Sequence, residues 1–351
     1  MGKMIKSKFK NLFNEVRQKI IAARFIAAKN INTIQVLTNF EVGRLIVEHE
    51  QAGKTRAGYG KETIKELSKG LSAEFGRGFS EDNLSNMRKF YLVYQNRLPA
   101  ISEMPSRKLA LTRETRETPF LLSWSHYVVL CKIRDEKERS FYEIESTRNN
   151  WSLKQLNRQY DSSLYERLAL SRNKKKVMEL SEKGQVMENP SDMIKNPLVL
   201  EFLGLPEKSE YSESDLEQAI IDKIEHFLLE LGKGFLFESR QKRFSFDEDH
   251  FFVDLVFYNR LLHCYVLIDL KIGKLTHQDI GQMQMYVNYF DRYIKQENEN
   301  LTVGIILCKE KHDALVEITL PKKANIYASE YKLYLPSKEE LKNKLIEWTE
   351  K

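Results

Sequence analysis

The stretch HFFVDLVFYNRLLHCYVLIDLKIGK, residues 250–274, contains two apolar runs that read as strands joined by the turn NRLL. Each run holds a carboxylate among apolar residues: Asp254 lies in the first, and Asp269 lies in the second, two positions before Lys271. Because side chains alternate across a strand, Asp269 and Lys271 point to the same face. Unpaired charges are costly in an apolar setting, so the pattern predicts that something holds these groups in place.

If the two strands pair as a hairpin, Asp254 and Asp269 lie side by side. Two close carboxylates repel, and neither ionises easily unless a cation lies between them. Oxygen ligands alone indicate Mg²⁺ rather than Zn²⁺. The acid-x-lysine spacing is a weak signal by itself, because residues 330–332 and 340–342 repeat it. A strand-end salt bridge is the alternative for Asp269 and Lys271.

A third carboxylate lies on an amphipathic helix predicted over residues 213–231. At helical spacing, Glu217 falls on the same face as Ile221, Ile224 and Leu228, the apolar stripe that should contact the sheet. An acid in this position is expected to bind a metal, another cation or a proton. The alternative is an acid that the helix N-terminus favours.

A second helix, predicted over residues 276–296, places Gln282 and Tyr286 one turn apart on one edge. Either side chain could contact phosphate or brace Lys271, although tyrosines at helical spacing often only pack. Further strands are predicted over residues 234–246, 301–310 and 324–336. The resulting order α-β-β-β-α-β predicts a mixed sheet with helices on its faces, an α+β or α/β fold.

The chain of 351 residues is expected to hold two domains: residues 1–171 are helical, residues 172–212 form a connector, and residues 213–351 form the mixed-sheet domain. Helical periodicity on both sides of the turn at 76–79 predicts a helix–turn–helix, with Ser80 as the N-cap of its second helix. The side chains of that helix that could read bases or phosphates are Asn83, Asn86, Arg88 and Lys89. A solvated helix face is the alternative.

Charge is distributed unevenly along the chain. Residues 1–200 hold 36 Lys and Arg against 23 Asp and Glu, a net charge of +13, whereas residues 201–351 hold 20 against 27, a net charge of −7. Such a division favours a polyanion as the partner of the basic half. Metal-binding carboxylates fit the acidic half.

The remaining composition predicts a cytoplasmic protein. The three cysteines, Cys131, Cys264 and Cys308, are far apart and odd in number, so we expect reduced, buried thiols. No apolar run approaches the roughly 20 residues that a membrane span needs. The first residues lack the continuous apolar core of a signal peptide.

These residues resemble the PD-(D/E)XK nuclease superfamily. The helix acid corresponds to Glu217, the strand acid to Asp254, the acid-x-lysine triplet to Asp269–Lys271, and the Gln-x-x-x-Tyr element to residues 282–286. One departure is Val253, which precedes Asp254 where the superfamily name implies proline.

The amino-acid sequence resembles YhcG-type proteins more closely still. The stretches that carry this resemblance are LEQAIIDKIEHFLLELGKGF, FFVDLVFYNRLLHCYVLIDLKIGK and GQMQMYVNYFDR, with GYGKETIKELSKGLSAEFGRGFSEDNLSNMRKFY and NNWSLKQLNRQYDSSLYERL in the first half. The resemblance extends from about residue 20 to about residue 340. It implies a restriction-endonuclease-like domain after a helix–turn–helix DNA-binding region.

The function that follows is a Mg²⁺-dependent DNA endonuclease. The expected metal ligands are Asp254, Asp269, Glu217 and the carbonyl oxygen of Leu270. Lys271 would orient or deprotonate a water, and Gln282 and Tyr286 would position the phosphate.

Two other functions stay open. The first is a nuclease fold that binds DNA, or assembles with restriction-modification or mobile-element components, without cutting. The second is an RNA nuclease. Double-strand cutting with one site per chain would imply a homodimer by symmetry.

Overall fold

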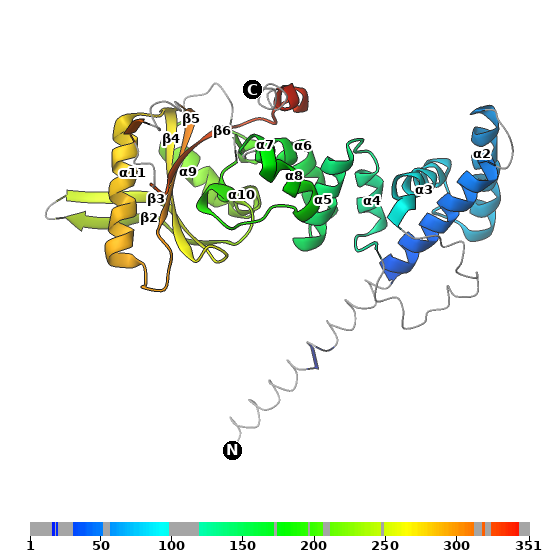
Figure 1. The fold of residues 1–351 in the computed structure, drawn as a ribbon, viewed down its shortest axis with the longest axis horizontal. Helices are drawn as coiled ribbons and strands as arrows, with labels where there is room; N and C mark the ends of the chain where they lie inside the picture. Colours follow the sequence, from blue (N-terminus) through cyan, green and yellow to red (C-terminus); the bar gives the residue numbers. More distant parts are fainter. Residues whose placement is uncertain are drawn as a thin grey trace, which may run out of the picture. The chain divides into compact units, whose positions relative to one another are not determined.

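The computed structural model of the chain describes residues 16–17, 19, 31–51, 57–97, 119–171, 174–195, 197–205, 211–246, 249–311, 318–319 and 324–343. The chain divides into two compact units, Met1–Leu156 and Asn157–Lys351 (Figure 1). No helix in these described ranges combines the length and the apolar character needed to cross a membrane. All three cysteines lie in described ranges, are buried and form no disulfide, as predicted.

The first unit is helical throughout its described residues. A helix over residues 31–51 is followed by α2 (Ala57–Phe75), α3 (Glu81–Tyr94), η1 (Gln95–Arg97), α4 (Trp124–Leu130), α5 (Glu136–Arg148) and α6 (Leu153–Asp161), which continues into the second unit. The ring centroid of Phe90 lies 5.7 Å from Phe40, 5.0 Å from Phe120 and 5.0 Å from Tyr127. This aromatic cluster joins the helix over 31–51 to α3 and α4.

The turn between α2 and α3 follows the predicted chemistry. Gly76 and Gly78 have φ values of 79° and 116°, in the region that favours glycine. The Ser80 hydroxyl accepts a hydrogen bond from the Asn83 N–H at 3.3 Å, so Ser80 is the N-cap of α3. The predicted turn and cap are therefore confirmed, while binding of nucleic acid by these helices stays a prediction.

The second unit is built on a six-stranded mixed sheet with the order β1-β6-β5-β4-β3-β2. Its strands are β1 (Leu198–Val199), β2 (Phe235–Phe246), β3 (Asp249–Asn259), β4 (Cys264–Lys274), β5 (Val303–Glu310) and β6 (Ile326–Lys332). The β2–β3 and β3–β4 pairs are antiparallel, whereas the β4–β5, β5–β6 and β1–β6 pairs are parallel. The predicted mixed sheet is confirmed, and β1 is an additional strand that the sequence analysis does not predict.

Helices cover both faces of this sheet, because its strands direct apolar side chains to two cores. The covering helices are α9 (Glu213–Asp222), α10 (Ile224–Leu231) and α11 (His277–Tyr289). Leu216 of α9 and Phe227 of α10 share one core with Ile268 of β4. Met283 of α11 shares the other core with Leu267 of β4. Figure 1 shows α11 on one side of the sheet and α9 and α10 on the other, which confirms the predicted helices on its faces. The order of the elements along the chain also agrees with the predicted α-β-β-β-α-β order.

Two helices differ from their predicted extents. The helix predicted over 213–231 is interrupted at Lys223, where φ is −121° and ψ is 30°, and it resumes as α10. Neither proline nor glycine marks this position, so the periodicity gives no sign of the break. The helix predicted over 276–296 is α11 followed by a π-helical turn, η6 (Phe290–Ile294).

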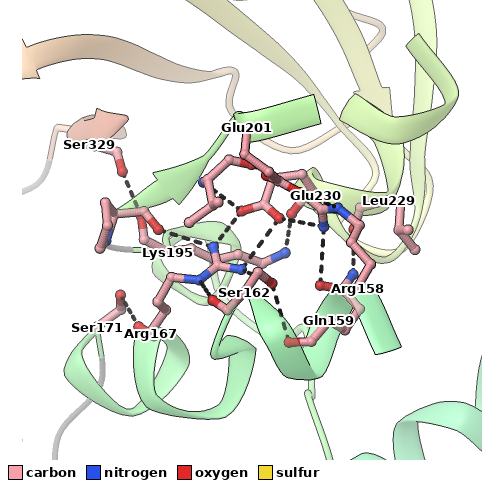
Figure 2. A network of polar contacts seen from close by, with 12 residues as sticks. Arg158, Gln159, Ser162, Arg167, Ser171, Lys195, Glu201, Leu229, Glu230 and Ser329 are labelled. Carbon is pink, nitrogen blue, oxygen red and sulfur yellow. Dashed lines mark hydrogen bonds and ion pairs between the residues drawn. The ribbon is translucent and has the colours of Figure 1, made fainter. Parts of the chain in front are cut away.

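A buried network of charges joins α10 to the part of the chain that precedes α9 (Figure 2). Its centre is Glu230, whose carboxylate lies 3.0 Å from the guanidinium of Arg158, accepts from Arg167, and accepts from the Val199 N–H at 3.0 Å. The Lys195 ammonium donates to the carbonyl oxygen of Glu230. Burial alone would raise the pKa of Glu230, but the charges of Arg167, Lys195 and Arg158 lower it to about 2.

This network gives structure to residues that the sequence analysis takes as a connector. The elements within the predicted connector are α8 (Lys174–Lys183), η4 (Pro190–Met193), β1 and η5 (Glu201–Leu203), and α7 (Leu164–Leu170), which carries Arg167, precedes it. β1 pairs with β6, and the Ser329 hydroxyl on β6 donates to the Lys195 carbonyl at 2.6 Å. These residues therefore contribute to the second unit.

Replacing Glu230 with Gln should destabilise the second unit, because Arg167 is fully buried and would lose its counter-charge. Breaking a buried ion pair in this way costs about 3–5 kcal/mol in the free energy of unfolding, measured by urea denaturation of the full chain. Glu238→Gln is the matched control, since the Glu238–Lys242 pair is exposed and should be worth less than about 1 kcal/mol. Equal losses in the two variants would contradict the account.

The same substitution should change the response to acid. The pKa of Glu230 is lowered on folding from 4.5 to about 2, so its stabilisation is complete above the unfolded value and is lost as pH falls through the folded one. The stability difference between wild type and Glu230→Gln should therefore shrink across this interval in urea titrations. A difference that stays constant from neutral pH to about pH 2 would argue against it.

Candidate active site

α9 begins at a well-formed cap that sets the direction of Glu217. The Ser212 hydroxyl accepts from the Asp215 N–H at 3.1 Å, and the Ser212 N–H donates to the Asp215 carboxylate at 2.9 Å. The buried face of α9 then consists of Leu216, Glu217 and Ile220. Glu217 is only 6% exposed, so this helix buries a carboxylate among apolar side chains.

β3 and β4 bring Asp254 and Asp269 together. The last pair of their ladder is Leu255↔Ile268, and the same register continued by one pair sets Asp254 opposite Asp269. The backbone ladder stops there, and Asp254 Oδ2 accepts a hydrogen bond from the Leu270 N–H at 2.8 Å. The side chain of Asp254 thus replaces the backbone as the link between the two strands.

Lys271 lies on the same face as Asp269, as the alternation predicts. Its Nζ is 3.0 Å from Asp269 Oδ2 and 3.6 Å from Glu213 Oε2. Burial lowers the pKa of Lys271, but Asp269 and Glu213 outweigh this effect and raise it above its ordinary value. Lys271 is therefore held as a cation beside the acidic group, which consists of the carboxylates of Glu213, Glu217, Asp254 and Asp269.

Asp254 acts electrostatically on both other carboxylates. Burial and the charge of Asp254 raise the pKa of Asp269 to about 7, against the lowering effect of Lys271. Burial also raises the pKa of Glu217; a hydrogen bond from Gln241 opposes this, and Asp254 adds to it. Lys271 and Gln241 thus offset only part of the effect of burial and of the charge of Asp254 on these two carboxylates.

Gln282 and Tyr286 of α11 border this acidic group. The Gln282 amide donates to the Tyr286 hydroxyl, and Tyr286 is buried. Burial and the charge of Asp269 raise the pKa of Tyr286 to about 12, although the hydrogen bond from Gln282 lowers it. The phenol therefore stays protonated beside the carboxylates.

Two residues of the site are absent from the sequence prediction. Glu213, in the first turn of α9, reaches Lys271 and accepts from the Ile272 N–H at 3.4 Å. Gln241 of β2 donates through Nε2 to Glu217 Oε2 at 2.5 Å and to Asp254 Oδ1 at 3.1 Å. A glutamine on an exposed edge strand carries no sequence signal for such contacts. An acid at a helix start is likewise common for reasons of capping alone.

The four candidate nucleic-acid residues of α3 differ in their surroundings. Asn83 donates to the Gly78 carbonyl and accepts from the indole of Trp124 at 2.9 Å. Arg88 forms an ion pair with Glu50 at 2.7 Å. Asn86 is half-buried and Lys89 is exposed. The structure places the candidates on one helix.

The donor chemistry of the acidic group fits a hard divalent cation. Within the described residues, the buried Glu217 Oε1 accepts no hydrogen bond, and the buried Asp269 Oδ2 has the Lys271 ammonium as its partner. All side-chain donors here are carboxylate oxygens, which suit Mg²⁺. The described part of the chain holds no three Asp, Glu, His or Cys side chains already gathered around one point. The Gln241 amide donates to both Glu217 and Asp254.

Comparisons with known proteins identify the family of the chain. The model of the YhcG PDDEXK nuclease domain matches residues 191–346, and that of the DUF1016 N-terminal domain matches residues 15–167. A protein of Escherichia coli (strain K12) named "Putative nuclease YhcG" is 38% identical over 356 residues, which cover 96% of this chain and 94% of that protein.

Two solved structures show weaker likenesses. A crystal structure of a repair endonuclease from Pyrococcus abyssi is 19% identical, with 37% of this chain and 50% of that chain covered and a TM-score of 0.25. The structure of an EndoMS–dsDNA2 complex is 15% identical, with 38% and 51% covered and a TM-score of 0.25. About half of each solved chain is matched.

The full-length match to the Escherichia coli relative is the decisive finding. It spans both units of the structure, and the nuclease-domain match includes α9, β3 and β4, which carry the acidic group, and α11, which borders it. This chain belongs to the YhcG family and joins a DUF1016 N-terminal domain to a YhcG PDDEXK nuclease domain.

Proposed function

We propose that this member of the YhcG family is a Mg²⁺-dependent endonuclease that hydrolyses phosphodiester bonds in DNA. The observation that carries the proposal is the meeting of Asp254, Asp269 and Lys271 where the β3–β4 ladder ends, within the PDDEXK nuclease domain. Phosphodiester hydrolysis needs an activated water and positive charge near the phosphate, and this group suits both needs.

The residues that would hold Mg²⁺ are Asp254, Asp269, Glu217 and the carbonyl oxygen of Leu270. Bound Mg²⁺ would supply activation of water and neutralisation of the charge that develops on the phosphate. Two observations support this assignment. Glu217 Oε1 is buried and accepts no hydrogen bond in the described structure, and burial together with the charge of Asp254 raises the pKa of both Glu217 and Asp269.

Lys271 is assigned to the charge of the reacting phosphate. Its raised pKa favours a lysine that orients water and stabilises negative charge over one that removes a proton. Its contacts with Asp269 and Glu213 hold the ammonium beside the acidic group. Removing this charge would deprive the transition state of the cation that Asp269 and Glu213 hold in place.

Gln282 and Tyr286 are assigned to phosphate positioning. Gln282 is half-buried and so is the member of the pair that a phosphate could reach. Tyr286 is 1% exposed and would act by holding Gln282 through the hydrogen bond between them.

The first unit is assigned to DNA binding through α2, the turn and α3. The basic balance of residues 1–200 supports a polyanionic partner. On α3, exposed Lys89 and half-buried Asn86 are the residues that could contact DNA directly, while the internal contacts of Asn83 and Arg88 would orient the helix. Cutting both strands with one site per chain would imply a homodimer by symmetry. The proposal also includes association with restriction-modification components.

Purified chain with Mg²⁺ should cleave plasmid DNA, and Asp254→Ala or Lys271→Ala should lower the rate by about 100-fold or more, because each removes charge that the transition state needs. Gel analysis of supercoiled, nicked and linear plasmid over time measures the rates. Glu238→Gln, an exposed change on β2, should cleave like wild type. Unchanged cutting by both site variants would remove these residues from the mechanism.

Matched DNA and RNA substrates separate the proposal from its alternatives. We expect DNA to be cut faster than RNA of the same sequence. Faster cutting of RNA would reassign the substrate. Salt-dependent DNA binding without cleavage, across several divalent metals and DNA substrates, would identify a nuclease fold that only binds or assembles.

The Mg²⁺ requirement should depend on pH near neutrality. Asp269 has a pKa raised to about 7, so below that pH a proton competes with the cation for the carboxylate. The Mg²⁺ concentration for half-maximal cleavage should rise up to about tenfold per unit as pH falls below about 7 and level off above it. A requirement that stays flat from about pH 6 to about pH 8 would contradict this ionisation.

A further inference from the structure

Gln241 of β2 has a backbone conformation that glutamine rarely adopts. Its φ is 47°, in the left-handed region, and it lies across from Asp254 between two register pairs of the β2–β3 ladder. Such conformations persist where the surrounding structure imposes them, and they concentrate at functional sites. The conformation of Gln241 therefore indicates a functional constraint on its side chain.

β3 is irregular at the same level. Leu255 and Phe257 belong to the core beneath α9 and α10, whereas Val253 belongs to the core beneath α11. Residues two apart on a regular strand share one face, so β3 changes face at Asp254. Distortions of this kind re-aim side chains, and here they involve facing residues on two neighbouring strands.

The Gln241 amide connects carboxylates from two other elements. Nε2 donates to Glu217 Oε2 at 2.5 Å and to Asp254 Oδ1 at 3.1 Å. Glu217 comes from α9 and Asp254 from β3, so one NH₂ group joins α9 to the sheet. Its two N–H dipoles offset part of the repulsion between the carboxylates, which a cation would otherwise offset.

We propose that Gln241 is a positioning residue that stabilises the metal-free site and must release Glu217 and Asp254 before a divalent cation binds. The amide and the cation compete for the same oxygens, Glu217 Oε2 and Asp254 Oδ1. A hydrogen bond that must break before the metal binds lowers the apparent affinity for the metal. The inference rests on the proposed function in taking Glu217 and Asp254 as metal ligands.

Isothermal titration of the full chain with Mn²⁺ or Mg²⁺ alone, without nucleic acid, tests this inference. Gln241→Gly is the informative variant, because glycine adopts a φ of 47° without strain while it removes the amide. It should bind metal about tenfold more tightly than wild type, since two hydrogen bonds to charged groups no longer oppose binding. The rise in melting temperature on adding metal should also be larger in this variant.

Gln218→Ala is the matched control. Gln218 is an exposed glutamine of α9 that donates to Asp222 and accepts from Arg240, with no hydrogen bond to Glu217 or Asp254 among the described residues. Its metal affinity should equal that of wild type. Should Gln241→Gly fail to fold, Gln241→Asn gives the same test, because asparagine tolerates the left-handed region and is one methylene too short to bridge both carboxylates.

The outcomes separate this inference from the function on which it rests. Equal or weaker metal binding by Gln241→Gly, with normal binding by wild type, would overturn the role of Gln241 and leave the metal site standing. No metal binding by wild type, or binding that survives Asp254→Ala, would overturn the site itself and this inference with it.

Discussion

The repulsion between Asp254 and its neighbouring carboxylates is the constraint on which the chemistry of the second unit depends. The β3–β4 register sets Asp254 opposite Asp269, and α9 adds Glu217 from the helical layer. The Lys271 ammonium pairs with Asp269, and the Gln241 amide and the Leu270 N–H donate to Asp254. These contacts offset part of the repulsion. Burial and the charge of Asp254 raise the pKa of Asp269 in spite of Lys271, so a cation beside these carboxylates would be favoured.

The surrounding fold explains how such a group is held together. Two apolar cores support the strands from both faces, so the ends of β3 and β4 are placed by packing and need no attraction between their acids. The Ser212 cap fixes the start of α9, and the buried Glu230 network fixes α10 to β1 and α7. Stability is thus supplied away from the site, where like charges oppose it.

Local patterns account for what the sequence reveals. The period of two places Asp269 and Lys271 on one face, the short turn sets the hairpin register, and the glycines at 76 and 78 mark the turn before α3. The missed features lack such patterns. β1 has only two residues, the break at Lys223 has no proline or glycine, and the partners of Glu230 lie 31 to 72 residues away along the chain. Gln241 adopts a left-handed conformation that its residue type does not indicate.

The most direct measurement of the central claim is the position of a bound cation. Crystals of the full chain grown with Mn²⁺, in place of Mg²⁺, would locate the ion by its anomalous scattering. We expect a peak in contact with carboxylate oxygens of both Asp254 and Asp269. A peak bound elsewhere, or an ordered site in which these carboxylates hold no ion at saturating Mn²⁺, would contradict it.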